Sequence, residues 1–176
     1  MNTTIDFQSL VEDARELNDE VPEGWVQTDN LEVIPEVGQF IIVEFAGVKV
    51  KATINGYPSI QIRCLNHGTG LSFFENLNFA ANKQTNQITL KTLAQLGVPA
   101  AIVDEGLDAV AQSLLGTWHC AYINSHQERD TRTFVQTYWN SPRDEMDAAD
   151  MAELIAEDRD FYADIAPSPE DSDSTF

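Results

Sequence analysis

The sequence predicts a mainly β protein, a small antiparallel barrel of the Greek-key type with a helical insertion and an acidic C-terminal tail. Two observations point to this fold. Runs rich in β-branched and aromatic residues lie on both sides of residues 84–116, and apolar and polar positions alternate along them. The segment 84–116 itself has apolar residues at the three-to-four-residue spacing of helices. Short antiparallel strands around a small helical segment favour a barrel over a sandwich or a parallel sheet.

The run 47–54 shows the strand pattern, because its valines and lysines alternate as they do along a strand with one buried face. The pair Asn55-Gly56 is typical of a hairpin turn and separates this run from the next. A polar loop at 125–131 separates the last two runs, which are expected to form a long hairpin. The expected strands are 38–45, 47–54, 57–65, 71–79, 117–124 and 132–139.

Two helices are expected in the insertion. The segment 84–97 places Leu90 and Leu93 on one face, and the segment 106–116 repeats the same apolar spacing. Each segment contains a glycine at its end, which is a common helix stop. A weaker amphipathic pattern at Met151, Leu154 and Ile155 predicts a short helix in the C-terminal part.

The net charge of -19 is unevenly distributed along the chain. Residues 1–36 carry a net charge of -9 and residues 144–176 one of -11, whereas residues 37–143 carry +1. We therefore expect an acidic N-terminal arm, with a short helix at 6–20 that packs on the barrel, a nearly neutral body and an acidic C-terminal tail. The last ten residues, which end in a lone Phe176, are expected to be disordered. The total charge thus says little about what the body binds.

Compartment and domain number follow from composition. With 176 residues, 43% of them hydrophobic, the chain is expected to form one domain with appendages. No run approaches 18 apolar residues, and the N-terminus lacks the basic and apolar regions of a secretion signal, so we expect a cytoplasmic protein without a membrane partner. Two cysteines form no disulfide framework, which fits a reducing compartment.

A zinc site is the first candidate chemistry. Its ligands would be Cys64, His67, His119 and Cys120, the inventory of a tetrahedral site. Because His119 and Cys120 are adjacent on a predicted strand, they point to opposite faces, and at most three ligands can converge. We therefore expect two buried cysteines and two ordinary histidines, with no metal and no other cofactor.

Catalytic motifs are missing from the sequence. The body contains no glycine-rich phosphate loop, no G-x-S-x-G, no H-E-x-x-H and no pair of acids in an apolar context. Asp104, Glu105 and Asp108 suit the start of the second helix, where the helix dipole favours carboxylates. We therefore expect a protein that is not an enzyme.

Basic and aromatic residues are interleaved in the body. Single-stranded nucleic acid is held by cations that follow its backbone and by aromatic rings on which bases stack. Most aromatic residues of so small a barrel are expected in its core, whereas the lysines and arginines are expected to point outward. The expected nucleic-acid contacts are Lys49, Lys51, Arg63, Lys83, Arg129 and Arg132, with Tyr57 and Trp139 for stacking.

A succession of motifs supports this expectation: PEVGQF (35–40), NGYPSIQIRCL (55–65), FFENLNF (73–79), NKQTNQITLKTLAQLG (82–97) and SLLGTWHCAYI (113–123). It resembles a bacteriophage family of OB-fold single-stranded-DNA-binding proteins, known at first only as a phage domain of unknown function. That family has an L-L-G-K-like turn where this chain reads LLGT, so one phosphate contact is missing at Thr117. The resemblance implies an OB-like barrel over about residues 35–143 that binds single-stranded DNA during phage replication or recombination.

The C-terminal sequence SPEDSDSTF is similar to the acidic tails, often closed by Phe, of bacterial and phage single-stranded-DNA-binding proteins. An acidic tail alone is more often a solubility device. The resemblance implies that the tail competes with DNA for the binding groove and presents its end to replication or recombination proteins. The residues expected to bind such partners are Glu170, Asp171, Asp173 and Phe176.

Two other functions are compatible with the sequence. The charge of -19 would suit an acidic DNA mimic that inhibits a host nucleic-acid enzyme, although a mimic should spread its charge over a folded surface. A structural or scaffolding phage protein would assemble and ignore DNA. A homo-oligomer is compatible with each of these hypotheses, and the sequence does not distinguish DNA from RNA.

Overall fold

A computed structural model describes residues 6–16, 26–29, 36–129, 132–142 and 146–165. Within these ranges the strands are β1 (Val26–Asp29), β2 (Phe40–Ala52), β3 (Pro58–Asn66), β4 (Leu71–Asn78), β5 (Trp118–Arg129) and β6 (Arg132–Trp139). The helices are α1 (Phe7–Arg15), α2 (Lys83–Gln95), α3 (Ala100–Glu105), α4 (Leu107–Leu114) and α5 (Ala148–Ile165).

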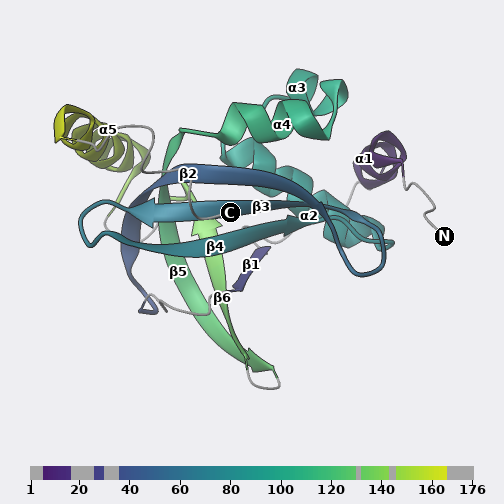
Figure 1. Ribbon diagram of the computed structural model, residues 1–176, viewed down its shortest axis with the longest axis horizontal. Helices are drawn as coiled ribbons and strands as arrows, with labels where there is room; N and C mark the ends of the chain where they lie inside the picture. Colours follow the sequence, from purple (N-terminus) through teal and green to yellow (C-terminus); the bar gives the residue numbers. More distant parts are fainter. Residues whose placement is uncertain (1–5, 17–25, 30–35, 130–131, 143–145, 166–176) are drawn as a thin grey trace.

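The strands form one antiparallel sheet in the order β1-β6-β5-β2-β3-β4 (Figure 1). β2 pairs with β5 along its first part and with β3 along the rest. The edge strands β1 and β4 approach each other, with Cα atoms within 8 Å, but no ladder joins them in the described residues. The sheet therefore curves strongly without being closed by hydrogen bonds.

The prediction of a mainly β barrel is confirmed only in part. The antiparallel sheet is present, and the helical insertion lies between β4 and β5 as expected. The helices, however, hold at least as many residues as the strands, and the sheet is not closed into a barrel. The protein is therefore a mixed α/β fold, because α3 and the length of α5 add to the helices that the sequence predicts.

A β-bulge lies in the middle of β2, where the sequence predicts two separate strands. The register with β3 shifts between Phe45 and Gly47, so Ala46 is an extra residue. A bulge of this kind bends a strand. Because it adds one residue, the alternation between the two faces is offset by one position after the bulge. Phe45 and Val48 consequently both pack on the core, although strict alternation would place them on opposite faces.

The core lies on the inner face of the curved sheet. Helices of the insertion cover it, and Leu93 and Leu114 are fully buried there. α1 packs on the same core, because Val11 is fully buried and the ring of Phe7 meets Phe79 edge to face at 5.0 Å. The predicted helix in the N-terminal arm and its packing on the body are thus confirmed.

α5 is longer than the short helix that the sequence predicts, with 18 residues. It lies beside β5 and β2 at one end of the molecule, opposite the end that carries α1 (Figure 1). Met151 is buried near its start, whereas most of its other residues are exposed or half-buried. None of the described helices combines the length and apolarity needed to cross a membrane. The last ten residues, predicted to be disordered, lie outside the described residues.

Asn140 joins the end of α2 to β5 and β6. Its backbone has a positive φ of 51°, which asparagine tolerates better than most residues. Its side-chain amide donates to the Gln95 carbonyl at 3.0 Å and to Nδ1 of His119 at 2.9 Å. Its side-chain oxygen accepts from the Cys120 amide at 2.9 Å. One side chain therefore holds the helical insertion against the sheet.

His119 is neutral in this arrangement. Its Nδ1 accepts from Asn140, and its Nε2 lies 2.7 Å from the Thr117 hydroxyl, which itself donates to the Leu114 carbonyl. Nε2 is therefore the protonated nitrogen that donates to Thr117. Burial lowers the pKa of His119 from 6.5 to about 4, which agrees with an uncharged ring.

Acid should consequently destabilise the fold through His119. Between pH 6.5 and about 4 the unfolded chain binds this proton and the folded protein does not, so the free energy of unfolding falls as pH is lowered through that window. The shift corresponds to at most about 3 kcal/mol. Urea unfolding of wild type and His119→Gln at about pH 7 and about pH 5 should show a smaller pH dependence in the variant. An equal pH dependence would contradict the buried neutral histidine.

Candidate nucleic-acid interface

Register places three of the predicted basic residues on one side of the sheet. This side, opposite the core, is called here the outer face. Lys49, Lys51 and Arg63 belong to this face. The rows of paired residues that contain them alternate with rows of residues that pack on the core from β2, β3 and β4. The rows across these strands are Gly47–Arg63–Phe74, Lys49–Gln61–Asn76 and Lys51–Ser59–Asn78.

The three basic residues differ in exposure. Lys49 and Lys51 are exposed, as the sequence predicts. Arg63 is only 8% exposed, and its Nε has no hydrogen-bond partner. Its pairing partner on β2 is Gly47, which has no side chain. Arg63 therefore points to the outer face as predicted, but its burial leaves little of the side chain accessible to a phosphate.

Of the two aromatic residues predicted to stack on bases, one is completely buried and the other is half-buried. Trp139 is completely buried on the inner face, with its ring edge to face against Phe45 at 5.2 Å. It cannot receive a base without opening the core, so this prediction is wrong. Tyr57, in the turn between β2 and β3, is half-buried and packs against the core, which leaves only part of its ring accessible.

The remaining predicted bases lie on α2 and in the β5–β6 hairpin. Lys83 begins α2, and its Nζ is 3.9 Å from a carboxylate oxygen of Glu16. Arg129 and Arg132 face each other in the register of the β5–β6 hairpin, which projects from the sheet (Figure 1). Their side chains lie outside the described part of the structure. β5 extends to Arg129, so most of the predicted loop at 125–131 is strand.

An aromatic row that the sequence did not single out crosses the outer face. Phe40, Tyr122 and Tyr138 are paired neighbours on β2, β5 and β6. The rings of Phe40 and Tyr122 lie 4.9 Å apart, and those of Tyr122 and Tyr138 lie 6.4 Å apart with their planes within 6° of parallel. All three are half-buried. This row, called the aromatic ladder, lies on the side of the sheet that carries the lysines.

A second aromatic group lies where α5 meets the sheet. His67, in the turn after β3, stacks on Trp118 of β5 at 4.9 Å and on Tyr162 of α5 at 5.1 Å. Nε2 of His67 is 2.7 Å from a carboxylate oxygen of Glu44, the pairing partner of Trp118. The three rings are called the stacked triad below, and they belong to the outer face because Glu44 and Trp118 do.

The candidate zinc ligands do not come together. Among the described residues, no group of three or more His, Cys, Asp or Glu could hold a metal ion. Burial raises the pKa of Cys64, with help from the nearby Glu75 carboxylate, and burial raises that of Cys120 to about 11. Burial therefore favours the protonated form of both thiols.

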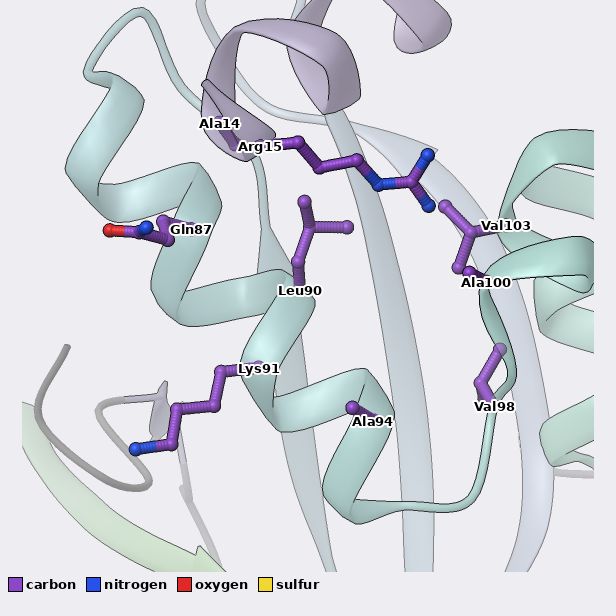
Figure 2. A pocket seen from close by; sticks show the side chains of 9 residues that line it. All are labelled: Ala14, Arg15, Gln87, Leu90, Lys91, Ala94, Val98, Ala100 and Val103. Atoms are coloured by element: carbon purple, nitrogen blue, oxygen red, sulfur yellow. The ribbon is translucent and has the colours of Figure 1, made fainter. Parts of the chain in front are cut away.

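A small pocket lies among the helices, away from the outer face. Its volume is about 320 Å³, at the lower end of the range for small-molecule sites. Figure 2 shows Leu90 pointing into it from α2, while Arg15 extends from α1 towards Val103. The Arg15 guanidinium is held by Asp104 at 2.9 Å. The pocket is mostly apolar and contains none of the predicted DNA-binding residues.

Burial of Trp139 and partial exposure of Tyr122 predict different costs of truncation. Trp139→Ala should lower the free energy of unfolding by about 3–5 kcal/mol, because it removes a large side chain from a closed core. Tyr122→Ala should cost less than half as much, because its ring is half-buried on the outer face. Urea melts of the two variants measure both values. Equal losses would contradict the assignment of the two aromatic residues to opposite faces.

Sequence comparisons assign this chain to no family. No protein-family model matches it, and no curated protein matches it with significance. The resemblance to phage single-stranded-DNA-binding proteins therefore stays a prediction. The function of the protein is therefore inferred from the outer face of the sheet.

Proposed function

We propose that the protein binds single-stranded DNA along the outer face of its sheet. The aromatic ladder of Phe40, Tyr122 and Tyr138 is the observation that carries this proposal. Stacking of a base on an aromatic side chain contributes about 1–3 kcal/mol and tolerates any sequence. Lys49 and Lys51, exposed on the same face, supply charges for the phosphates. The aromatic ladder and the two lysines suit a protein that binds DNA rather than an enzyme.

The order of the strands supports an OB-like fold as part of this proposal. An OB-fold is a five-stranded, partly open Greek-key barrel. If β1 is left out, β2 to β6 become strands one to five in chain order. In the sheet order β6-β5-β2-β3-β4, strand one then lies between strands two and four, and the helical insertion follows strand three. OB-folds bind oligonucleotides on the face of strands two and three and with the loops after strands one and four. In this chain those are β3, β4, the turn with Tyr57 and the hairpin tip.

The hairpin tip adds a second site for phosphate. Arg129 and Arg132 are directly paired in the register, and like charges at such positions destabilise a hairpin by themselves. By register, the hairpin tip and the lysine pair Lys49 and Lys51 lie beyond opposite ends of the aromatic ladder, which suits a strand that passes over the rings.

The acidic tail belongs to the same proposal. The body has a net charge of +1, whereas residues 144–176 carry -11. A tethered acidic segment competes with DNA at high local concentration. We propose that the tail weakens DNA binding in this way and recruits replication or recombination proteins through Phe176, acting during phage DNA replication or recombination. Glu170, Asp171 and Asp173 lie with Phe176 outside the described residues.

A DNA mimic is the second candidate, and one observation favours it. α5 presents acids on a folded surface, since Glu153, Glu157 and Asp160 are all exposed. A mimic would use such a helix to occupy the nucleic-acid site of an enzyme. It predicts that no variant of the protein binds DNA, whereas the favoured proposal predicts binding that depends on the outer face.

The lysines of β2 provide a test of the favoured function. Wild type should bind labelled oligo-dT at low salt, and the logarithm of the affinity should fall linearly with the logarithm of the salt concentration. The double variant Lys49→Gln/Lys51→Gln should bind more weakly and reduce this slope by about 1.4, because two phosphate contacts are lost. Lys91→Gln, on α2 beside the pocket, removes one charge away from the outer face and should leave the slope unchanged. No oligo-dT binding by wild type at low salt would exclude the proposal.

Removal of residues 166–176 tests the electrostatic role of the tail. This truncation removes three carboxylates and Phe176 but keeps α5, which is packed on the body through Met151. The truncated protein should bind oligo-dT more tightly than wild type at low salt, and the difference should shrink at about 0.3 M salt as screening grows. Phe176→Ala should leave DNA affinity nearly unchanged. Affinity that is unaltered by the truncation would remove the tail from the mechanism.

A further inference from the structure

The stacked triad joins α5 to the sheet through nearly parallel rings. The planes of His67 and Trp118 differ by 16°, those of His67 and Tyr162 by 27°, and those of Trp118 and Tyr162 by 13°. Such geometry is that of planar groups stacked on one another, rather than the edge-to-face contacts of the core, such as that between Phe45 and Trp139. Tyr162 is thus stacked on the sheet like a planar ligand.

The position of the triad is continuous with the proposed DNA-binding surface. Trp118 pairs with Glu44, and the next outward row on β2 and β3 is Gly47–Arg63. Two rows away on the other side, Phe40 pairs with Tyr122 of the aromatic ladder. Trp118 therefore lies on the outer face between the ladder and the lysines of β2, and the ring of Tyr162 lies nearly parallel to it, with 6.5 Å between the ring centroids.

The attachment of α5 to this surface is limited. Met151 is buried near the start of the helix, and Tyr162 stacks near its end. Between them, Leu154 is 38% exposed and Phe161, the neighbour of Tyr162, is 60% exposed. Arg159 is an exposed basic residue of this helix, and its Nε donates to a carboxylate oxygen of the adjacent Asp160 at 3.3 Å. Ile155, Ala156 and Asp158 are half-buried between Met151 and Tyr162. After Met151, none of the described residues of the helix is fully buried, so its C-terminal end can leave the sheet without loss of the core.

We propose that Trp118 and His67 form a base-stacking site, and that Tyr162 occupies it in the free protein in place of a base. This inference rests on the proposed function. The phenol ring of Tyr162 is planar and of a size similar to a pyrimidine, and its hydroxyl reaches the β3–β4 turn near Gly68. A DNA base and Tyr162 cannot stack on the same ring faces together, so binding at this site displaces the C-terminal end of α5. The carboxylates of α5 leave the surface with it, which couples stacking to the electrostatic effect of the tail.

A double-mutant cycle on the full-length chain tests this competition. Tyr162→Ala should bind oligo-dT about tenfold more tightly than wild type, since a base then stacks without displacing a ring. Leu154→Ala, on the same helix and 38% exposed, is the matched control and should bind like wild type. Tyr162→Phe keeps the ring and should also bind like wild type. Trp118→Leu should bind about tenfold more weakly.

The decisive variant is Trp118→Leu/Tyr162→Ala. If Tyr162 acts by covering Trp118, its removal gives no more than about a twofold gain when the tryptophan is absent. If Tyr162→Ala still raises the affinity tenfold in the Trp118→Leu background, α5 acts by charge alone. This result would overturn the stacking site. Equal affinity of wild type and Tyr162→Ala would overturn it as well, while leaving DNA binding itself intact. If no variant binds oligo-dT at low salt, the proposed function fails and the inference fails with it. Circular dichroism melts show that each variant is folded.

Discussion

The pairing of β2 along both of its edges is the constraint on which the rest of the structure depends. Its first residues pair with β5 and its later ones with β3, so this strand joins the two halves of the sheet. The bulge at Ala46 lies where the partner changes. If Ala46 instead occupied a regular position in the ladder, Lys49 and Lys51 would turn towards the core and Val48 towards solvent. The division of the sheet into an inner and an outer face therefore rests on one strand and one bulge.

The two faces have different chemistry because they have different surroundings. On the inner face, burial keeps His119 neutral and the thiol of Cys64 protonated, so potentially reactive groups there serve packing and hydrogen bonding. On the outer face, the aromatic ladder is half-buried and the lysines are exposed. The acids that dominate the net charge lie mainly in the arms, and α5, which carries some of them, contacts the outer face through Tyr162. Binding and its regulation would then occupy adjoining parts of one surface.

Local patterns predicted the parts of the fold that local physics determines. The alternation in 47–54 and the apolar spacing in 84–97 depend on near neighbours, and β2 and α2 formed where they indicate. The sequence could not decide which of Tyr138 and Trp139 faces the core, since a period of two does not say which side is inside. Strand β1 has only four residues and pairs with the distant β6, so no local pattern marks it. The contact of Tyr162 with Trp118 is likewise long-range, and for that reason the covered end of the outer face was missed.

The most direct test of the central claim is a map of the bound strand on the protein. Backbone amide shifts of the isotope-labelled full-length chain, followed by nuclear magnetic resonance during titration with oligo-dT, provide this map. The proposed function predicts that the largest changes fall on outer-face residues of β2, β3 and β5, including Lys49, Gln61 and Tyr122. Changes confined to the pocket residues Leu90 and Val103, or no changes at low salt, would contradict it.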